Sequence, residues 1–197
     1  MLATGFGPLR FMIAPLEIPD CLAPDACAAL RAELRAIAGT AASLLGGEVR
    51  PLVRRATRLA VPAATSQRLK RLVTQSMPAM EAHFGVALAG CEDPQVLRYE
   101  AGDFFVAHQD GNTPLIHDDS RFRKLSAILF LSRQAEEPSP ETYGGGSLVL
   151  HGPYSGPDIR VAVAPAPGTL VAFPAETTHE VIPVTHGERF TIVTWFR

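Results

Sequence analysis

The hydrophobic pattern of this 197-residue chain changes at Pro94, and that change restricts the fold more than any other feature. From Pro94 onward, apolar residues recur with period two in short runs that Gly, Pro and Asp clusters separate, a pattern typical of β-strands. Short strands in this number after a helical start predict a mainly β fold, a sandwich or jelly roll with helices packed outside. The strands are expected at 95–100, 104–110, 124–132, 147–151, 158–164, 168–173, 179–184 and 189–196.

The N-terminal part shows a helical pattern instead. One helix is expected to begin at Pro24 and to stop near Gly39, because apolar residues recur there at a spacing of three to four. A second helix is expected over 65–84, and Pro78 should kink or split it. The segment 52–61 is a further candidate strand.

We interpret 1–197 as one domain, with a helical support region at 1–93 and a β core at 94–197. Two segments between the expected strands, 111–123 and 133–146, exceed ordinary hairpin connections. Long loops on a rigid scaffold frequently carry function, so both are candidates for such a role.

Composition excludes several classes of protein. Hydrophobic residues make up 47% of the chain and charged residues 19%, which is neither a disordered nor a fibrous composition. Without an apolar run of roughly 20 residues or the pattern of a secretory signal, we expect a cytoplasmic protein that does not contact a membrane. The three cysteines, an odd number without a Cys-x-x-Cys motif, favour neither a disulfide framework nor a zinc–thiolate site.

The formal net charge of −2 conceals an uneven distribution. Residues 31–71 hold nine Lys or Arg but only the acids Glu33 and Glu48, so the remaining chain is strongly acidic. Such a split indicates an acidic partner, two elements that dock on each other, or solvated faces. A nucleic-acid partner is disfavoured, because no aromatic residues for base stacking alternate with Arg50, Arg54, Arg55 and Arg58.

Three residues have the chemistry of a metal site. His108 and Asp110 lie two apart in an expected strand, so their side chains project from one face. A third candidate, His179, opens another expected strand about 70 residues later. Two imidazoles and one carboxylate that leave coordination positions open form the facial triad of non-haem Fe(II) oxygenases. His-x-Asp alone is also compatible with a polar pair on a surface strand.

The last expected strand places Arg189, Thr191, Val193 and Trp195 on one face. If that face points into a barrel, Arg189 is a buried cation that needs an anion. A planar guanidinium is suited to holding a carboxylate through two parallel hydrogen bonds.

A series of short motifs over roughly 94–197 resembles a known family. In their content and order, these motifs are similar to the prolyl-4-hydroxylase-like branch of the 2-oxoglutarate/Fe(II)-dependent dioxygenases. The matching segments are RYEAGDFF at 98–105, HQD at 108–110, RKLS at 123–126, FLS at 130–132, YGGGSL at 143–148, PGTLVAF at 167–173, HEVIPVTHGER at 179–189 and WF at 195–196.

The resemblance implies a double-stranded β-helix, a jelly-roll or cupin-like barrel flanked by helices, that holds Fe(II) through His108, Asp110 and His179. Arg189 would bind the distal carboxylate of the co-substrate 2-oxoglutarate, and Tyr99 would point into the same pocket. Family prolyl hydroxylases often have a tyrosine that contacts the co-substrate where this chain has Phe130. Ser126 or Thr191 would then supply the missing hydroxyl.

The implied reaction is hydroxylation of an unactivated C–H bond with O2, releasing succinate and CO2, with ascorbate as reductant. The favoured substrate is a small molecule or a peptide. The group hydroxylated would be the side chain of a peptidyl or free amino acid, with a prolyl side chain favoured. A non-catalytic sensor that binds iron and 2-oxoglutarate, a nucleic-acid demethylase and a cupin-like metal enzyme are the alternatives, and the oligomeric state stays open. His117, His151 and His186 are expected to be solvated, and Gly144, Gly145 and Gly146 to allow close backbone packing.

Overall fold

The computed structural model describes residues 14–44, 47–111, 118–152 and 160–197, and the following statements concern these ranges. The helices are α1 (Pro24–Arg35), α2 (Ala63–Thr74) and α3 (Met77–Phe84), with a 3-10 turn η2 (Asp119–Phe122). The strands are β1 (Leu16–Ile18), β2 (Gly39–Ala41), β3 (Arg54–Arg55), β4 (Thr57–Leu59), β5 (Gln95–Tyr99), β6 (Phe104–His108), β7 (Leu125–Phe130), β8 (Arg133–Gln134), β9 (Thr142–Gly145), β10 (Leu148–His151), β11 (Arg160–Val163), β12 (Leu170–Pro174), β13 (His179–Val181), β14 (Val184–Gly187) and β15 (Arg189–Phe196).

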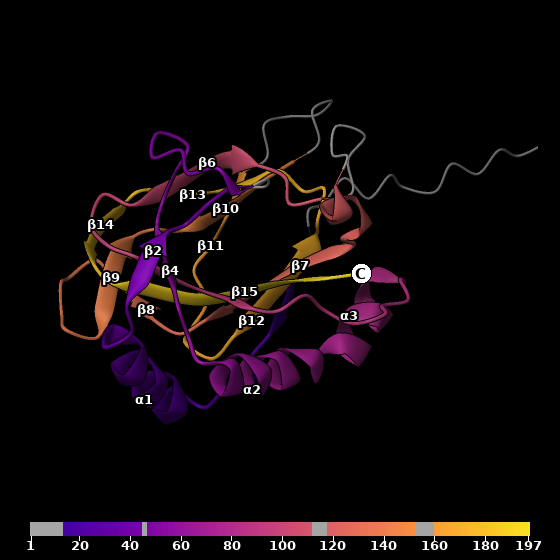
Figure 1. Cartoon of the computed structure of the whole chain (residues 1–197), viewed down its shortest axis with the longest axis horizontal. Helices are drawn as coiled ribbons and strands as arrows, with labels where there is room; N and C mark the ends of the chain where they lie inside the picture. The colour runs from indigo at the N-terminus through magenta and orange to yellow at the C-terminus, as the bar shows by residue number, and fades with distance from the viewer. Residues whose placement is uncertain (1–13, 45–46, 112–117, 153–159) are drawn as a thin grey trace, which may run out of the picture.

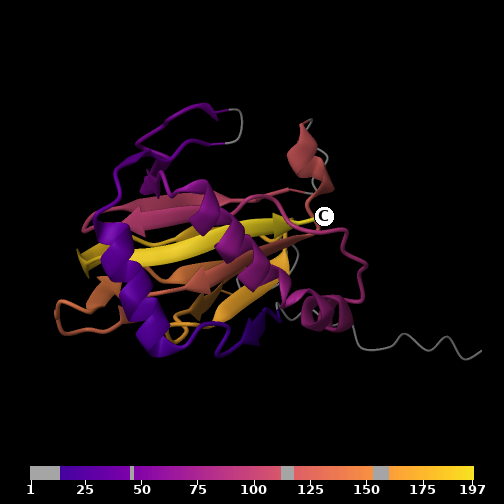
Figure 2. The same cartoon turned by 60° about the horizontal axis from the view of Figure 1, so that its bottom comes forward.

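The strands form a jelly roll. A seven-stranded sheet has the order β1-β12-β7-β15-β5-β4-β2, and a five-stranded sheet has the order β11-β10-β13-β6-β3. The three helices lie on one side of the large sheet and the strands β6, β13 and β10 on the other (Figure 1). The turned view shows α1 in indigo and α2 in magenta crossing the large sheet in front of β15 (Figure 2). The predicted mainly β fold with outer helices is confirmed.

The central strand β7 is apolar on both faces apart from Ser126. All six of its residues are buried, because helices cover one face of the large sheet and the second sheet covers the other. Leu125, Ala127 and Leu129 belong to a core that includes Leu34 of α1 and Leu69 of α2. Residues of the opposite parity face the interior between the sheets, where the cluster formed by Ile128, Phe130, Leu148, Leu150, Val163, Val171 and Phe173 is packed.

Most expected strands are present with bounds shifted by one or two residues. The expected strand over 179–184 is wrong as a single element, because β13 ends before Pro183 and β14 begins at Val184 in a different, three-stranded sheet. The expected loop over 133–146 instead contains β8 and β9. The strand expected over 158–164 is found as β11, although 158–159 lie outside the described residues.

The helices begin and end where local chemistry predicts, with one exception. Pro24 occupies the first turn of α1, and Pro78 the first turn of α3, so the expected split after α2 is confirmed. Gly85 ends α3 in the left-handed conformation, with φ 65°. Gly39 is not the stop of α1: the helix ends at Arg35, and Gly39 opens strand β2, where a side chain would collide with Thr57.

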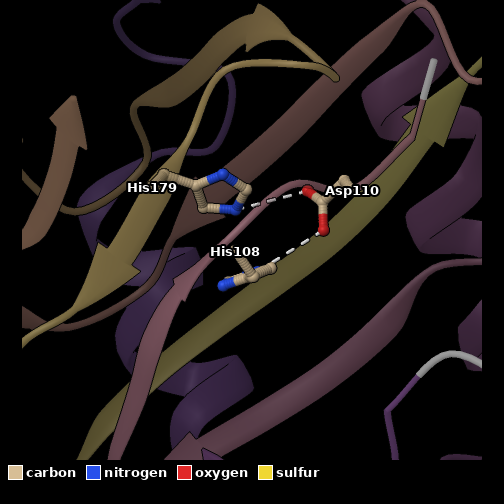
Figure 3. Close-up of side chains that lie close together, drawn as sticks. All are labelled: His108, Asp110 and His179. Atoms are coloured by element: carbon tan, nitrogen blue, oxygen red, sulfur yellow. Dashed lines mark ion pairs between the residues drawn. The ribbon is translucent and has the colours of Figure 1, made fainter. Parts of the chain in front are cut away.

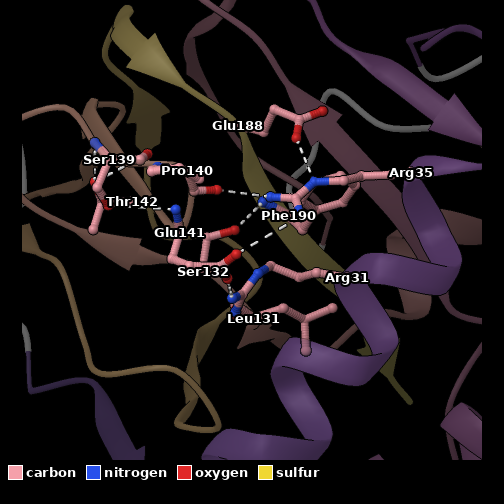
Figure 4. A network of polar contacts seen from close by, with 10 residues as sticks. All are labelled: Arg31, Arg35, Leu131, Ser132, Ser139, Pro140, Glu141, Thr142, Glu188 and Phe190. Atoms are coloured by element: carbon pink, nitrogen blue, oxygen red, sulfur yellow. Dashed lines mark hydrogen bonds and ion pairs between the residues drawn. The ribbon is translucent and has the colours of Figure 1, made fainter.

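The basic segment 31–71 docks on the acidic remainder of the chain, one of the alternatives raised by the charge split. Arg31 of α1 is buried and bonds the Leu131 carbonyl and Glu141. Arg35 donates to Glu188 at 2.7 Å and to the Pro140 carbonyl at 3.0 Å (Figure 4). Further pairs join the two parts of the chain: Arg55 with Asp103 and Lys70 with Asp93.

Helix length and cysteine pairing are two further features of the described ranges. None of the described helices combines the length and apolarity needed to cross a membrane. All three cysteines are free, and Cys27 is fully buried in the helical core.

Candidate active site

The three candidate metal ligands meet at one end of the barrel interior. Strands β6 and β13 pair antiparallel with His108 directly opposite His179, and Asp110 follows two residues after His108. The Nε2 atom of His108 lies 3.6 Å from Asp110 Oδ1, and that of His179 lies 3.4 Å from Asp110 Oδ2 (Figure 3). One potential ligand atom from each residue lies within 4.8 Å of the others, so a single metal ion can contact all three.

Each imidazole is oriented by the backbone carbonyl group of the residue two positions earlier in the chain. His108 Nδ1 lies 2.8 Å from the Val106 carbonyl oxygen, and His179 Nδ1 lies 2.9 Å from that of Thr177. A carbonyl oxygen only accepts, so in each ring Nδ1 carries a proton, and Nε2 is the atom that faces Asp110. Such a hydrogen bond fixes ring orientation and leaves Nε2 as the atom offered to a metal ion. Phe105 stacks on His108 with ring centroids 3.5 Å apart.

Asp110 is held as an ionised carboxylate. Burial opposes ionisation, but interactions with His179 and His108 outweigh it and keep the pKa of Asp110 well below its usual range. Ser126 Oγ on β7 donates to Asp110 Oδ2 at 2.7 Å, and Arg123 donates to the Asp110 carbonyl at 3.0 Å. Burial and the neighbouring His179 lower the pKa of His108. Burial also acts to lower the pKa of His179, but the adjacent Asp110 outweighs it and raises that pKa. A divalent cation held here would take the place of the His179 proton, because histidine ligands bind metal in the deprotonated form.

A cavity of about 320 Å³ extends from these ligands between the two sheets. Its wall includes the predicted face of β15, namely Arg189, Thr191, Val193 and Trp195, together with Tyr99 of β5. Apolar side chains of Leu44, Val53 and Val106 also contribute. The cavity therefore joins the metal ligands and Arg189 in one space.

Arg189 is buried without an anion in the described part of the chain. Its side chain is 1% exposed, and Nε and Nη2 have no hydrogen-bond partner there. Nη1 makes only a long contact of 3.5 Å with Thr191 Oγ1. The guanidinium carbon lies 5.2 Å from the Tyr99 ring centroid and 5.0 Å from that of Phe130. Because an unpaired buried charge is costly, this guanidinium fits a carboxylate ligand such as the far end of 2-oxoglutarate.

The structure separates the residues that the sequence grouped around the co-substrate. Tyr99 and Thr191 lie on the cavity wall beside Arg189, and Trp195 also lines the cavity. Ser126 makes its hydrogen bond to Asp110, so any contact with the co-substrate stays a prediction for this residue. Phe130 is fully buried against Arg189 and offers no hydroxyl.

Some residues near the site had no role assigned from the sequence. Tyr143 of β9 is fully buried, and its hydroxyl has no hydrogen-bond partner among the described residues. Arg123 lies over the Trp195 ring at 3.7 Å and pairs with Glu92 at 2.7 Å. The motif quoted for the resemblance contained Tyr143 and Arg123, but only the tertiary packing reveals their neighbours.

His151, His186 and the triple glycine lie outside the metal cluster. His151 is half-buried and pairs with Glu180 at 3.1 Å, and His186 is half-buried on β14. Both were expected to be solvated, and both are only partly exposed. His117 falls outside the described residues. Gly144 and Gly145 contact β14 so closely that a side chain would collide with His186 and with the Pro183 carbonyl, respectively. The expectation of close backbone packing is confirmed for these glycines.

A jelly roll with a two-histidine, one-carboxylate cluster and a buried arginine in one cavity is the architecture of a non-haem iron oxygenase. Comparison with known proteins makes the class specific. The family model of the 2OG-Fe(II) oxygenase superfamily matches residues 94–197. The chain belongs to this superfamily and is a 2-oxoglutarate-dependent, Fe(II)-dependent hydroxylase.

Individual relatives support the assignment over most of the chain. A PKHD-type hydroxylase of Paracoccus denitrificans is 30% identical over 183 residues, which cover 91% of this chain and 76% of that protein. A prolyl-4-hydroxylase of Pseudomonas putida is 25% identical with a TM-score of 0.68, covering 93% of this chain and 91% of that one. A viral collagen prolyl hydroxylase in complex with 2-oxoglutarate, from Paramecium Bursaria Chlorella virus-1, has the same fold, with a TM-score of 0.61 at 18% identity, covering 93% and 94% of the chains.

Ser126→Ala tests the support of Asp110. The substitution removes the hydroxyl that donates to Asp110 Oδ2, and losing such a partner of a ligand typically weakens metal binding by about 10-fold to 100-fold. We therefore expect Fe(II) affinity to fall by about 10-fold, with little change in 2-oxoglutarate affinity once the metal site is saturated. Anaerobic titration with Fe(II), followed by titration with 2-oxoglutarate at saturating metal, measures both.

Proposed function

We propose that this protein hydroxylates a prolyl-type C–H bond in a peptidyl or free amino-acid substrate. The observation that carries the proposal is a single cavity that contains three mutually close metal ligands and a buried, unpaired Arg189. That arrangement accommodates a metal ion and a dicarboxylate side by side. It also leaves a largely apolar wall for the group to be oxidised.

The residues have distinct roles in this proposal. His108, Asp110 and His179 hold Fe(II), Arg189 binds the distal carboxylate of 2-oxoglutarate, and Tyr99 shapes the wall between them. Iron and 2-oxoglutarate together supply the oxidation of the C–H bond by O2, with succinate and CO2 as the other products. The protein contributes orientation and the exclusion of water, since ligands and arginine are mostly buried.

The substrate class rests on the relatives rather than on a specific contact. The name of the 25% identical Pseudomonas putida protein states a prolyl-4-hydroxylase activity for that protein. The apolar side chains of Leu44, Val53 and Val106 on the cavity wall favour a pyrrolidine ring over a charged group. We further propose that the whole chain forms one catalytic domain located in the cytoplasm.

The test is product formation by the purified protein. We expect succinate release that requires Fe(II) and 2-oxoglutarate, with ascorbate maintaining turnover as is typical of the family. Proline-containing peptides, free proline and a cell extract are then compared by mass spectrometry for the gain of one oxygen atom. Oxygen gain on a prolyl residue supports the proposal, and oxidation of another residue type alone contradicts its substrate class.

The same assay distinguishes the other functions considered. A sensor module would bind iron and 2-oxoglutarate without forming succinate under any substrate condition. A demethylase would release formaldehyde from methylated nucleic acid, although several residues of the basic segment are already paired with acids of the barrel.

A further inference from the structure

Tyr143 is, after Tyr99, a second buried tyrosine close to Arg189. Tyr143 lies on β9, whose partner β14 leads directly into Arg189 at the start of β15. Its side chain is 0% exposed, yet its hydroxyl forms no hydrogen bond of good geometry with any described residue. A buried hydroxyl without a partner is unfavourable, so the position of Tyr143 calls for an explanation.

Tyr143 and Arg189 are direct neighbours. An ideal Cβ at Gly146 would lie 3.1 Å from the Tyr143 ring and 3.2 Å from Arg189 Cδ, so both side chains pack over the same glycine. Gly146 has φ 61°, a conformation that favours glycine. The cavity wall includes Arg189 but not Tyr143, so Tyr143 lies beside Arg189 outside the cavity lining.

The chemistry of the two groups is complementary. Burial raises the pKa of Tyr143, and the nearby Arg189 only partly offsets this, so the hydroxyl stays neutral and able to accept a hydrogen bond. Arg189 offers two donor nitrogens without a partner among the described residues, Nε and Nη2, and a guanidinium can only donate. The Phe130 ring also lies close to this guanidinium, but it has no oxygen or nitrogen atom that could accept a hydrogen bond from it.

We propose that Tyr143 is a positioning residue for Arg189, whose hydroxyl accepts a hydrogen bond from the guanidinium and fixes its orientation toward the distal carboxylate of 2-oxoglutarate. Tyr143 thereby compensates for Phe130, which occupies the position where related enzymes often have a tyrosine. This inference rests on the proposed role of Arg189 in the co-substrate pocket. By this inference, strand β9 contributes to selectivity for 2-oxoglutarate through Tyr143, although Tyr143 does not line the cavity.

The experiment compares two ligands on Mn(II)-loaded protein by calorimetric titration. 2-Oxoglutarate carries the distal carboxylate, whereas 2-oxopentanoate has a methyl group in its place. Tyr143→Phe is expected to weaken 2-oxoglutarate binding by about 10-fold, the value of one hydrogen bond to a charged group. Binding of 2-oxopentanoate should change less than about 2-fold, because that ligand makes no use of the Arg189 charge. In turnover, KM for 2-oxoglutarate should rise while kcat is retained.

Two further variants separate positioning from general stability. Ser132→Ala is the matched control, because it removes another buried hydroxyl beside β15, one that accepts from the Phe190 N–H at 2.9 Å (Figure 4). It should lower the thermal midpoint without changing the preference for 2-oxoglutarate over 2-oxopentanoate. In an Arg189→Met background, Tyr143→Phe should have no additional effect on 2-oxoglutarate affinity, because coupled residues are not additive.

Some results would contradict the role of Tyr143, and a different result would contradict the role of Arg189. Equal weakening of both ligands by Tyr143→Phe, unchanged 2-oxoglutarate affinity, or a full additional loss in the Arg189→Met background would each overturn the positioning role. An Arg189→Met variant that binds 2-oxoglutarate normally is a different result. It contradicts the proposed function itself, because the co-substrate carboxylate then does not depend on Arg189.

Discussion

His108→Ala should eliminate Fe(II) binding and reduce hydroxylation to background while leaving the protein folded. The substitution removes one of three ligands whose Nε2 atom is held toward Asp110 by the Nδ1–Val106 hydrogen bond. Changes in the partners of ligands already cost about 10-fold to 100-fold in metal affinity, so loss of a ligand should cost at least about 100-fold. Anaerobic Fe(II) titration and the iron content of the purified variant measure this effect.

The matched control is His83→Ala. His83 lies on α3, outside the metal cluster, and its closest polar contact is 3.3 Å from the Ala14 carbonyl oxygen. This variant should bind iron with unchanged stoichiometry, because it removes an imidazole without altering the cavity. Stoichiometric, tight iron in His108→Ala would refute the assignment of the metal ligands.

Arg189→Met should raise the 2-oxoglutarate requirement by about 100-fold to 1000-fold while iron binding stays within a few-fold of normal. Loss of one partner of a buried, hydrogen-bonded charge pair costs about 2 to 5 kcal/mol, which corresponds to about 30-fold to 5000-fold and brackets this range. Methionine retains part of the aliphatic volume packed between the Tyr99 and Phe130 rings. KM for 2-oxoglutarate and calorimetric titration at saturating metal provide the measurement.

The same substitution should stabilise the protein when no co-substrate is present. Arg189 has two buried donors without partners in the described ranges, and replacing a buried charge by an apolar residue is often neutral or stabilising. We expect a higher thermal midpoint for Arg189→Met without 2-oxoglutarate, and a smaller gain in that midpoint on adding it. If Arg189→Met lost iron as severely as His108→Ala, the division between metal ligands and co-substrate arginine would be incorrect.

The β core was predictable because its strands carry their own periodicity. The face of β15 that lines the cavity follows directly from alternation, since Arg189, Thr191, Val193 and Trp195 are two apart. The triad was also identifiable, because the closeness of His108 and Asp110 is local and His179 opens another predicted strand, a set that the resemblance then supported. Their mutual distances required the pairing of β6 with β13, which the sequence pattern does not encode.

The short edge elements were not predictable for physical reasons. Strand β1 has three residues and exists through pairing with β12, about 150 residues away in the sequence. Strand β9 contains two glycines, which normally disfavour strands, but here they permit close contact with β14. Likewise, the partner of Ser126 and the position of Tyr143 beside Arg189 depend on packing between strands, so composition and periodicity carry no signal for them.

The direct pairing of His108 with His179 has a consequence for the stability of the folded protein. A bound ion would act as a cross-link between chain segments about 70 residues apart, and the unfolded chain has no comparable site. Binding to the folded state alone adds free energy of unfolding that grows with metal concentration, about 2.7 kcal/mol at 100 times Kd. Resistance to proteolysis should therefore follow iron supply, so that metal-starved cells contain less of this protein as well as less of its activity.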